Sequence, residues 1–188
     1  MLYLIIQVKY ANWDLRFKTA TKRHVENECD DIGAWDTSQV NNMYNLFAHK
    51  NLGPVSFEQN LNGWDTSEVT SMMGTFQSSN FNGNISNWNT GKVLNMHTMF
   101  YNNADFNGDI SNWDTSNVRD MSAMFSGATA FNQDLNKWNV WLVNNMDNMF
   151  NSAGISNADL SGWDTGHVKS MAWMFHNAYV VFERSVRA

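Results

Sequence analysis

Apolar and polar positions along this chain follow a pattern that recurs about every 25 residues. The clearest copy has four apolar residues at spacings of i, i+3, i+6 and i+7, namely Val118, Met121, Met124 and Phe125. Residues at this spacing share one face of a helix. The polar segment 114–116 precedes them and Gly127 follows, which is typical of a helix start and a helix end. The pattern therefore predicts a short helix in each repeat.

Tryptophan marks the repeat most clearly. Six tryptophans stand in nearly constant register, at Trp35, Trp64, Trp88, Trp113, Trp138 and Trp163. A valine, a methionine and a phenylalanine follow each of them at fixed distances. Self-similarity at a fixed period is typical of a solenoid, in which each unit buries its apolar face against its neighbours.

The residues before each tryptophan complete the predicted unit. The segment 131–138 is short and rich in turn residues, and we interpret the piece around Asp134 and Leu135 as a short strand. The predicted fold is therefore an α/β solenoid of about six strand–turn–helix units. We expect the recurring columns to form its core. This core includes Trp64, Trp88, Trp113, Trp138, Trp163, Met121 and Phe125.

The repeats predict one elongated domain over residues 32–178, with a cap at each end. Residues 1–31 are the predicted N-terminal cap, and residues 179–188 are the predicted C-terminal cap. The interval between the first two tryptophans is the longest and holds the only proline, Pro54. We therefore expect an insertion loop at 49–56.

Polar columns accompany the tryptophans. Asp or Asn follows each of them directly, at Asp36, Asp65, Asn89, Asp114, Asn139 and Asp164. A second such column stands four residues before each tryptophan, at Asp31, Asn60, Asn84, Asp109, Asp134 and Asp159. Because Asn replaces Asp freely, helix capping and turn ladders explain these columns better than charge does. Calcium binding by stacked carboxylates is the alternative.

Threonines also align in the repeat. They are interpreted as helix caps, with an ice-binding array as the alternative: Thr37, Thr66, Thr90, Thr115 and Thr165.

Charge argues against two classes of partner. The chain has 18 acidic and 12 basic residues and a net charge of -6. Nucleic acid binding needs clustered basic residues, and acidic charge disfavours anionic lipid. The apolar run at 2–6 is too short to span a bilayer and short for the core of a signal peptide. We therefore expect no binding of nucleic acid and no membrane insertion. No export signal is visible, so either the chain is not exported by this route or its true start lies upstream.

No arrangement typical of an enzyme occurs. The five histidines stand in five different registers of the repeat, without metal-binding spacing: His24, His49, His97, His167 and His176. A phosphate-binding glycine loop and a nucleophile elbow are also missing from the sequence. We therefore expect no catalytic residues, no cofactor and no metal site.

Repeats five and six depart from the polar character of the other surface positions. Trp141 and Leu142 replace small or polar residues, and Trp173 takes an outward position of the last predicted helix. Exposed aromatic residues in neighbouring units are typical of interfaces. We predict that Trp141, Leu142 and Trp173 contact a partner. The alternative is that they pack under the C-terminal cap near Tyr179 and Phe182.

The motif resembles the repeat of the BspA-like family. The resemblance rests on Trp-Asp-Thr-Ser-Asn-Val at 113–118, on Met121, on Met124-Phe125 and on Phe131-Asn132, and it covers about 32–178. That repeat occurs in mycoplasma lipoproteins, bacterial surface proteins and many microalgal and viral proteins. The resemblance implies a leucine-rich-repeat-like fold, a cell-surface or extracellular location, and roles in adhesion and protein–protein contact. It supplies no catalytic residue.

Two functions follow as expectations. The first is a non-enzymatic scaffold that binds a protein partner or a glycan. The alternative is a structural subunit that is permanently built into a large assembly, such as a viral particle or a membrane complex.

Overall fold

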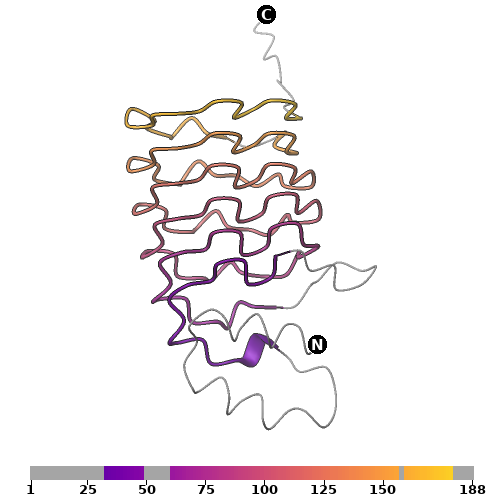
Figure 1. The fold of residues 1–188 in the computed structure, drawn as a ribbon, viewed down its shortest axis with the longest axis vertical. Helices are drawn as coiled ribbons and strands as arrows, with labels where there is room; N and C mark the ends of the chain where they lie inside the picture. The colour runs from indigo at the N-terminus through magenta and orange to yellow at the C-terminus, as the bar shows by residue number, and fades with distance from the viewer. Residues whose placement is uncertain (1–31, 49–59, 157–158, 180–188) are drawn as a thin grey trace, which may run out of the picture.

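The computed structural model describes residues 32–48, 60–156 and 159–179. Within these ranges the only helix is η1 (Ile32–Ala34), a 3-10 helix of 3 residues. The remaining described chain consists of turns, bends, irregular segments and isolated bridges. It winds in successive circuits that lie one above another, from the N-terminal end at the bottom of Figure 1 to the C-terminal end at the top.

We call each circuit a coil. The six coils have the ranges 32–48, 61–84, 85–109, 110–134, 135–156 and 160–179, numbered 1 to 6. Parallel bridges join equivalent residues of consecutive coils along one line: Asn42, Ser71, Asn95, Asp120, Asn145 and Ser170. The contact between one coil and the next is therefore repeated through the described chain.

The predicted α/β solenoid of strand–turn–helix units is wrong. The described residues contain no α-helix and no strand longer than a bridge, and the segment 118–125 consists of irregular residues, the bridge residue Asp120 and turn residues at 122–125. The strand predicted around Asp134 and Leu135 is also absent. A two-turn helix leaves most of its N–H and C=O groups without partners inside the helix. Here these groups bond to neighbouring coils instead, so the helix is not formed.

Backbone hydrogen bonds in coil 4 explain why turns show the apolar spacing of a helix. The N–H of Met124 donates to Met121 O at 3.2 Å and closes a turn within the coil. The N–H of Met121 donates across to Asn145 O at 3.0 Å in coil 5. Alternate N–H groups thus close turns and bind the next coil, so the backbone is paired without a helix. Overlapping four-residue turns, each closed by a bond between residues three apart, place apolar residues at the same spacing that suggested a helix.

Left-handed backbone at two fixed positions separates these turns from a helix. In coil 4 the residues are Ala123, with φ of 52°, and Gly127, with φ of 74°. Residues at the first position in the other coils are Asn45, Gly74, Thr98, Asn148 and Trp173. A Cβ on Gly127 would lie 2.2 Å from Asn102 Oδ1 in coil 3. Position 127 therefore requires glycine for two reasons, the close approach of the Asn102 side chain and the left-handed backbone.

Stacked rings form the core. The rings of Trp88 and Trp113 are 6.3 Å apart and nearly parallel, and those of Phe100 and Phe125 are 5.6 Å apart. Most of the sequence-predicted core residues are buried, and Trp163 in coil 6 is only partly buried. The buried members are Trp64, Trp88, Trp113, Trp138, Met121 and Phe125. Apolar side chains are thus shared between coils, and no coil has a core of its own.

The predicted caps and insertion loop fall almost entirely outside the described residues. The structure does not describe 1–31, 49–59 or 180–188. Of the predicted C-terminal cap only Tyr179 is described, and it is exposed. The domain boundaries therefore stay predictions.

Candidate partner-binding surface

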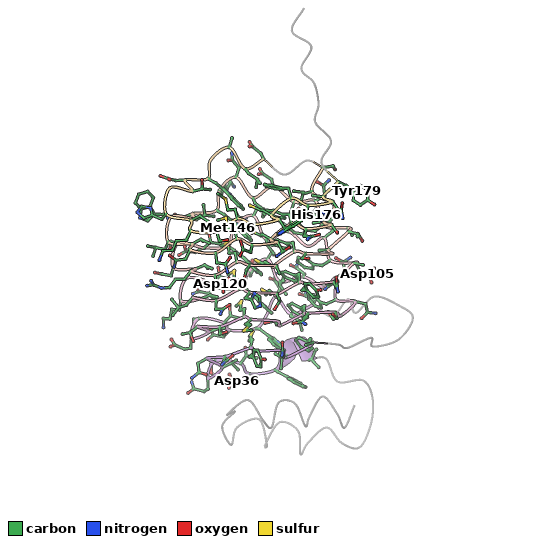
Figure 2. All side chains as sticks on the ribbon, turned by 45° about the horizontal axis from the view of Figure 1, so that its top comes forward. Asp36, Asp105, Asp120, Met146, His176 and Tyr179 are labelled. Atoms are coloured by element: carbon green, nitrogen blue, oxygen red, sulfur yellow. The ribbon has the colours of Figure 1, made fainter. Side chains whose placement is uncertain are left out.

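Exposed large hydrophobic residues gather at the C-terminal end of the described chain. Eight such residues are exposed in the described ranges, and six of them lie between residues 141 and 179. These six are Trp141, Leu142, Met171, Trp173, Phe175 and Tyr179. Figure 2 places His176 and Tyr179 together at that end of the stack.

Trp141 and Leu142 lie on an edge turn of coil 5. The turn is held by the N–H of Trp141, which donates to Asn139 Oδ1 at 3.0 Å. Equivalent Asx turns in the other coils carry Ser38, Ser67, Gly91, Ser116 and Gly166 in place of this tryptophan. The local backbone is therefore common to all coils, and the exposed indole is particular to coil 5.

Trp141 has a neighbour that the sequence analysis missed. The ring of His167 in coil 6 lies 3.8 Å from the ring of Trp141 between centroids, at an interplanar angle of 62°. The two residues occupy adjacent columns of consecutive coils, so the repeat alignment contained the signal. The contact makes Trp141 and His167 one surface feature.

Trp173 lies in an unusual conformation. Its φ is 60°, and 64% of its surface is exposed. The ring of His176 meets the Trp173 ring edge-on at 4.7 Å. Left-handed backbone is rare for a bulky residue and costs on the order of 1–3 kcal/mol.

The structure does not join the three predicted residues into one cluster. Trp141 and Leu142 are adjacent on coil 5, and Trp141 contacts His167. Trp173 contacts His176 in coil 6, and no ring contact links Trp141 to Trp173 in the described part of the chain. A partner that contacts all three must therefore span two features on neighbouring coils. The alternative of packing under the cap near Phe182 involves a residue outside the described ranges.

The last coil exposes residues that earlier coils bury. Met171 and Phe175 are 45% and 46% exposed, whereas their equivalents Met146 and Phe150 are fully buried. They belong to the same Met and Phe columns, so sequence reasoning assigned them to the core. Their exposure follows from position, because coil 6 is the last described coil.

The aspartate columns form Asx turns. Of the predicted helix caps and turn ladders, the helix caps are wrong, because no described helix begins at these residues. The hydroxyl of Ser116 and its N–H, at 2.9 Å, donate to Asp114 and lower the pKa of that carboxyl. Asp109 accepts the N–H of Ser111 at 3.0 Å, and its pKa is lowered in the same way. Among the described residues no group of three or more His, Cys, Asp or Glu side chains could hold a metal ion.

The threonine column joins coils. Thr115 Oγ1 donates to Asn139 O at 2.9 Å in coil 5, and Thr37, Thr66 and Thr90 make the equivalent bond. The interpretation of these residues as helix caps is therefore wrong. All four are buried, so they present no threonine array to solvent or ice.

A family model described as Mycoplasma protein of unknown function, DUF285, matches residues 14–118 and 77–187. The chain belongs to this family. The BspA-like resemblance included mycoplasma proteins, and the DUF285 description agrees with it in that respect alone. No curated protein and no solved structure matches the chain. In the described residues no helix of this DUF285 protein has the length and hydropathy needed to cross a membrane.

Proposed function

We propose that this DUF285 protein is a non-enzymatic repeat scaffold that binds a protein partner through Trp141, Leu142 and Trp173. The observation that carries the proposal is the exposed side chain of Trp173 on left-handed backbone. The resemblance of the motif to the BspA-like repeat supports an adhesin-like role at a cell surface.

The fold does not require a tryptophan at position 173. The equivalent positions in coils 1 to 5 hold Asn45, Gly74, Thr98, Ala123 and Asn148. Asn and Gly enter this conformation more easily than tryptophan does. With 64% of its surface exposed, Trp173 gains little burial in return. Tryptophan is, in contrast, among the residues that contribute most to protein interfaces.

The chemistry of the surface favours a protein over a glycan. Leu142 is exposed beside Trp141 and offers no hydrogen bond to a hydroxyl-rich ligand. Aromatic and aliphatic side chains together are typical of the centre of a protein interface. A glycan site would need several convergent polar groups around the indole.

The proposal is tested by affinity capture from the source cells. The intact chain is compared with the double variant Trp141→Ser/Trp173→Asn, and recovered proteins are quantified by mass spectrometry. We expect at least one protein to be recovered about tenfold less with the double variant, because hot-spot tryptophans contribute on the order of 2 kcal/mol or more each.

Leu94→Ser is the matched control, because Leu94 is an exposed apolar residue of coil 3. It should leave recovery unchanged. Thermal unfolding of each variant establishes that its fold is retained. Equal recovery with the double variant and with the intact chain would refute the proposal.

A further inference from the structure

Asparagine directly followed by glycine occurs at three places in the described chain, at Asn62, Asn82 and Asn107. Such a pair is chemically reactive, because glycine has no Cβ and its backbone nitrogen can approach the side-chain amide of the asparagine. The N–H groups of the three glycines donate no hydrogen bond to another backbone group among the described residues. The attacking nitrogen of each pair is therefore not held by the backbone of the stack.

Two of these pairs occupy the same register of the repeat and have the same preceding residue. The segments are Phe81-Asn-Gly and Phe106-Asn-Gly, and coil 4 has Phe131-Asn-Gln in this register. Asn82 and Asn107 are both exposed. Because their immediate neighbours in sequence are identical, a difference in reactivity between them in the folded chain must come from their contacts.

The two side chains differ in the hydrogen bonds that hold them to the next coil. Asn82 Oδ1 accepts the N–H of Asn107 at 3.0 Å. Asn107 Oδ1 accepts the N–H of Asn132 at 2.9 Å and also Gln133 Nε2 at 2.8 Å. The residue of coil 3 equivalent to Gln133 is Gly108, which has no side chain. Asn82 therefore lacks the second bond that holds Asn107.

These bonds oppose the reaction of asparagine with the following glycine. The reacting nitrogen must lie within about 3–3.5 Å of the carbon it attacks, and turning the side-chain amide toward its own backbone breaks its bonds to the next coil. One extra hydrogen bond corresponds to about fivefold in rate. Asn62 is less exposed than Asn82, and its Oδ1 accepts the N–H of Asn87 at 2.6 Å, so it should also react more slowly than Asn82.

We propose that Asn82 is a site of spontaneous deamidation and that the Gln133 side chain protects Asn107 from the same reaction. The Gly83 nitrogen loses its proton to solvent and forms a bond to Cγ of Asn82. The bond from Cγ to Nδ2 then breaks, and ammonia leaves with a proton from solvent. Water adds to one of the two carbonyls of the resulting succinimide and opens the ring. Opening at the side-chain carbonyl gives aspartate, and opening at the backbone carbonyl gives isoaspartate.

The modification would weaken the contact between coils 2 and 3. Both products carry a negative charge that asparagine lacks. Isoaspartate also adds a carbon atom to the backbone between Phe81 and Ile85, which are 0% and 1% exposed. Because both of these side chains are buried in the core, the longer backbone cannot keep both in register. The proposal concerns coils 2 to 4 and does not depend on the proposed partner surface of coils 5 and 6.

Peptide mapping of the full chain tests the proposal. The folded protein is incubated at mildly alkaline pH, and tryptic peptides are analysed over time by tandem mass spectrometry, with a zero-time sample to correct for reaction during digestion. Trypsin places Asn82 in peptide 51–92 and Asn107 in peptide 93–119. We expect Asn82 to deamidate about fivefold faster than Asn107. In denaturant both rates should rise and become similar, because the bonds between coils are lost. Asn132 precedes glutamine and is the slow reference.

Gln133→Ala isolates the protecting bond. This variant removes the Nε2 donor and keeps the bond from the N–H of Asn132, so Asn107 should deamidate about fivefold faster and at the rate of Asn82. Gln39→Ala is the matched control, because Gln39 is an exposed glutamine of coil 1 that bonds to Ser38 O within its own coil. It should change neither rate. Thermal unfolding of both variants verifies that the fold is retained.

Four results would overturn the proposal. The first is an equal or faster reaction at Asn107 or Asn62 than at Asn82 in the folded chain. The second is an unchanged rate at Asn107 in Gln133→Ala. The third is a difference between Asn82 and Asn107 that persists in denaturant, because local sequence would then be its cause. The fourth is the absence of deamidation at Asn82 while the peptide in denaturant reacts.

Discussion

The indole N–H of Trp138 donates to Ile110 O at 3.1 Å, across the boundary between coils 4 and 5. Ile110 stands three residues before the tryptophan of its own coil, and its carbonyl also accepts the N–H of Trp113 at 3.1 Å. One backbone carbonyl thus closes a turn and fastens the next coil. Trp64, Trp88, Trp113 and Trp163 make the same bond. The tryptophan column is therefore a set of connections between coils as well as a stack of rings.

Trp138→Phe should lower the free energy of unfolding by about 2 kcal/mol, because it removes a buried hydrogen bond and leaves a cavity beside the remaining ring. Chemical denaturation followed by circular dichroism measures the change. Trp141→Phe is the control at an exposed position and should change stability by less than about 0.5 kcal/mol. Equal effects of the two substitutions would contradict the assignment of Trp138 to the core.

Gly127→Ala should lower the free energy of unfolding by about 1–3 kcal/mol, because φ is 74° and the new Cβ would meet Asn102 Oδ1. The double variant Gly127→Ala/Asn102→Gly removes that clash, keeps a residue that enters left-handed backbone easily at position 102, where φ is 51°, and should recover part of the loss. Thermal unfolding of the two variants measures the recovery. If the double variant is the less stable of the two, the clash is not the cause.

The sequence pattern predicted which columns of residues are buried, but it could not predict the secondary structure of the backbone that carries them. Burial depends on register, and Val118, Met121 and Phe125 recur at the same register in every coil. A helix and a run of overlapping turns both place every third or fourth residue on one side. The difference lies in backbone hydrogen bonds between coils, which leave no mark in the periodicity of apolar residues.

Local conformation was only partly visible in the sequence. Gly74 and Gly127 indicate left-handed backbone, but Ala123 and Trp173 adopt it without any preference of their own. At Ala123 a bond to the next coil accompanies this conformation, since the N–H of Ala123 donates to Asp147 O at 2.7 Å, whereas the Trp173 N–H makes no equivalent bond among the described residues. The candidate surface was predicted residue by residue, whereas its contact with His167 required knowledge of which columns meet between coils.

Acid should destabilise the stack through its Asx turns. Hydrogen bonds from serine hydroxyl and N–H groups lower the pKa values of Asp65, Asp109, Asp114 and Asp159 below the ordinary 3.8. A lowered pKa in the folded state contributes stability above the unfolded value, and this contribution is lost as pH falls through the folded value. The contribution of these four aspartates to the free energy of unfolding should therefore be constant from pH 7 to about 5. It should decrease below about pH 4.

Asp114→Asn provides the control for this acid dependence. Asn89 and Asn139 already make the equivalent turn, at 3.1 and 3.0 Å, so the variant should fold normally at pH 7. Its stability should fall less steeply between pH 4 and pH 3, because one lowered pKa has been removed. Denaturant titrations at each pH measure the slope. An unchanged slope would mean that Asp114 does not contribute to the acid dependence.

Trp173→Asn should raise the free energy of unfolding by about 1 kcal/mol, because asparagine enters left-handed backbone more easily than tryptophan and little burial is lost. Asn45 and Asn148 already occupy the equivalent positions, with φ of 52° and 56°. Trp141→Asn, outside the left-handed positions, should give no such gain. Denaturant midpoints measure both changes. A loss of stability in Trp173→Asn would mean that the indole supports the fold, and it would remove the main argument for a binding role. A gain combined with reduced partner recovery would separate the requirements of binding from those of folding at this residue.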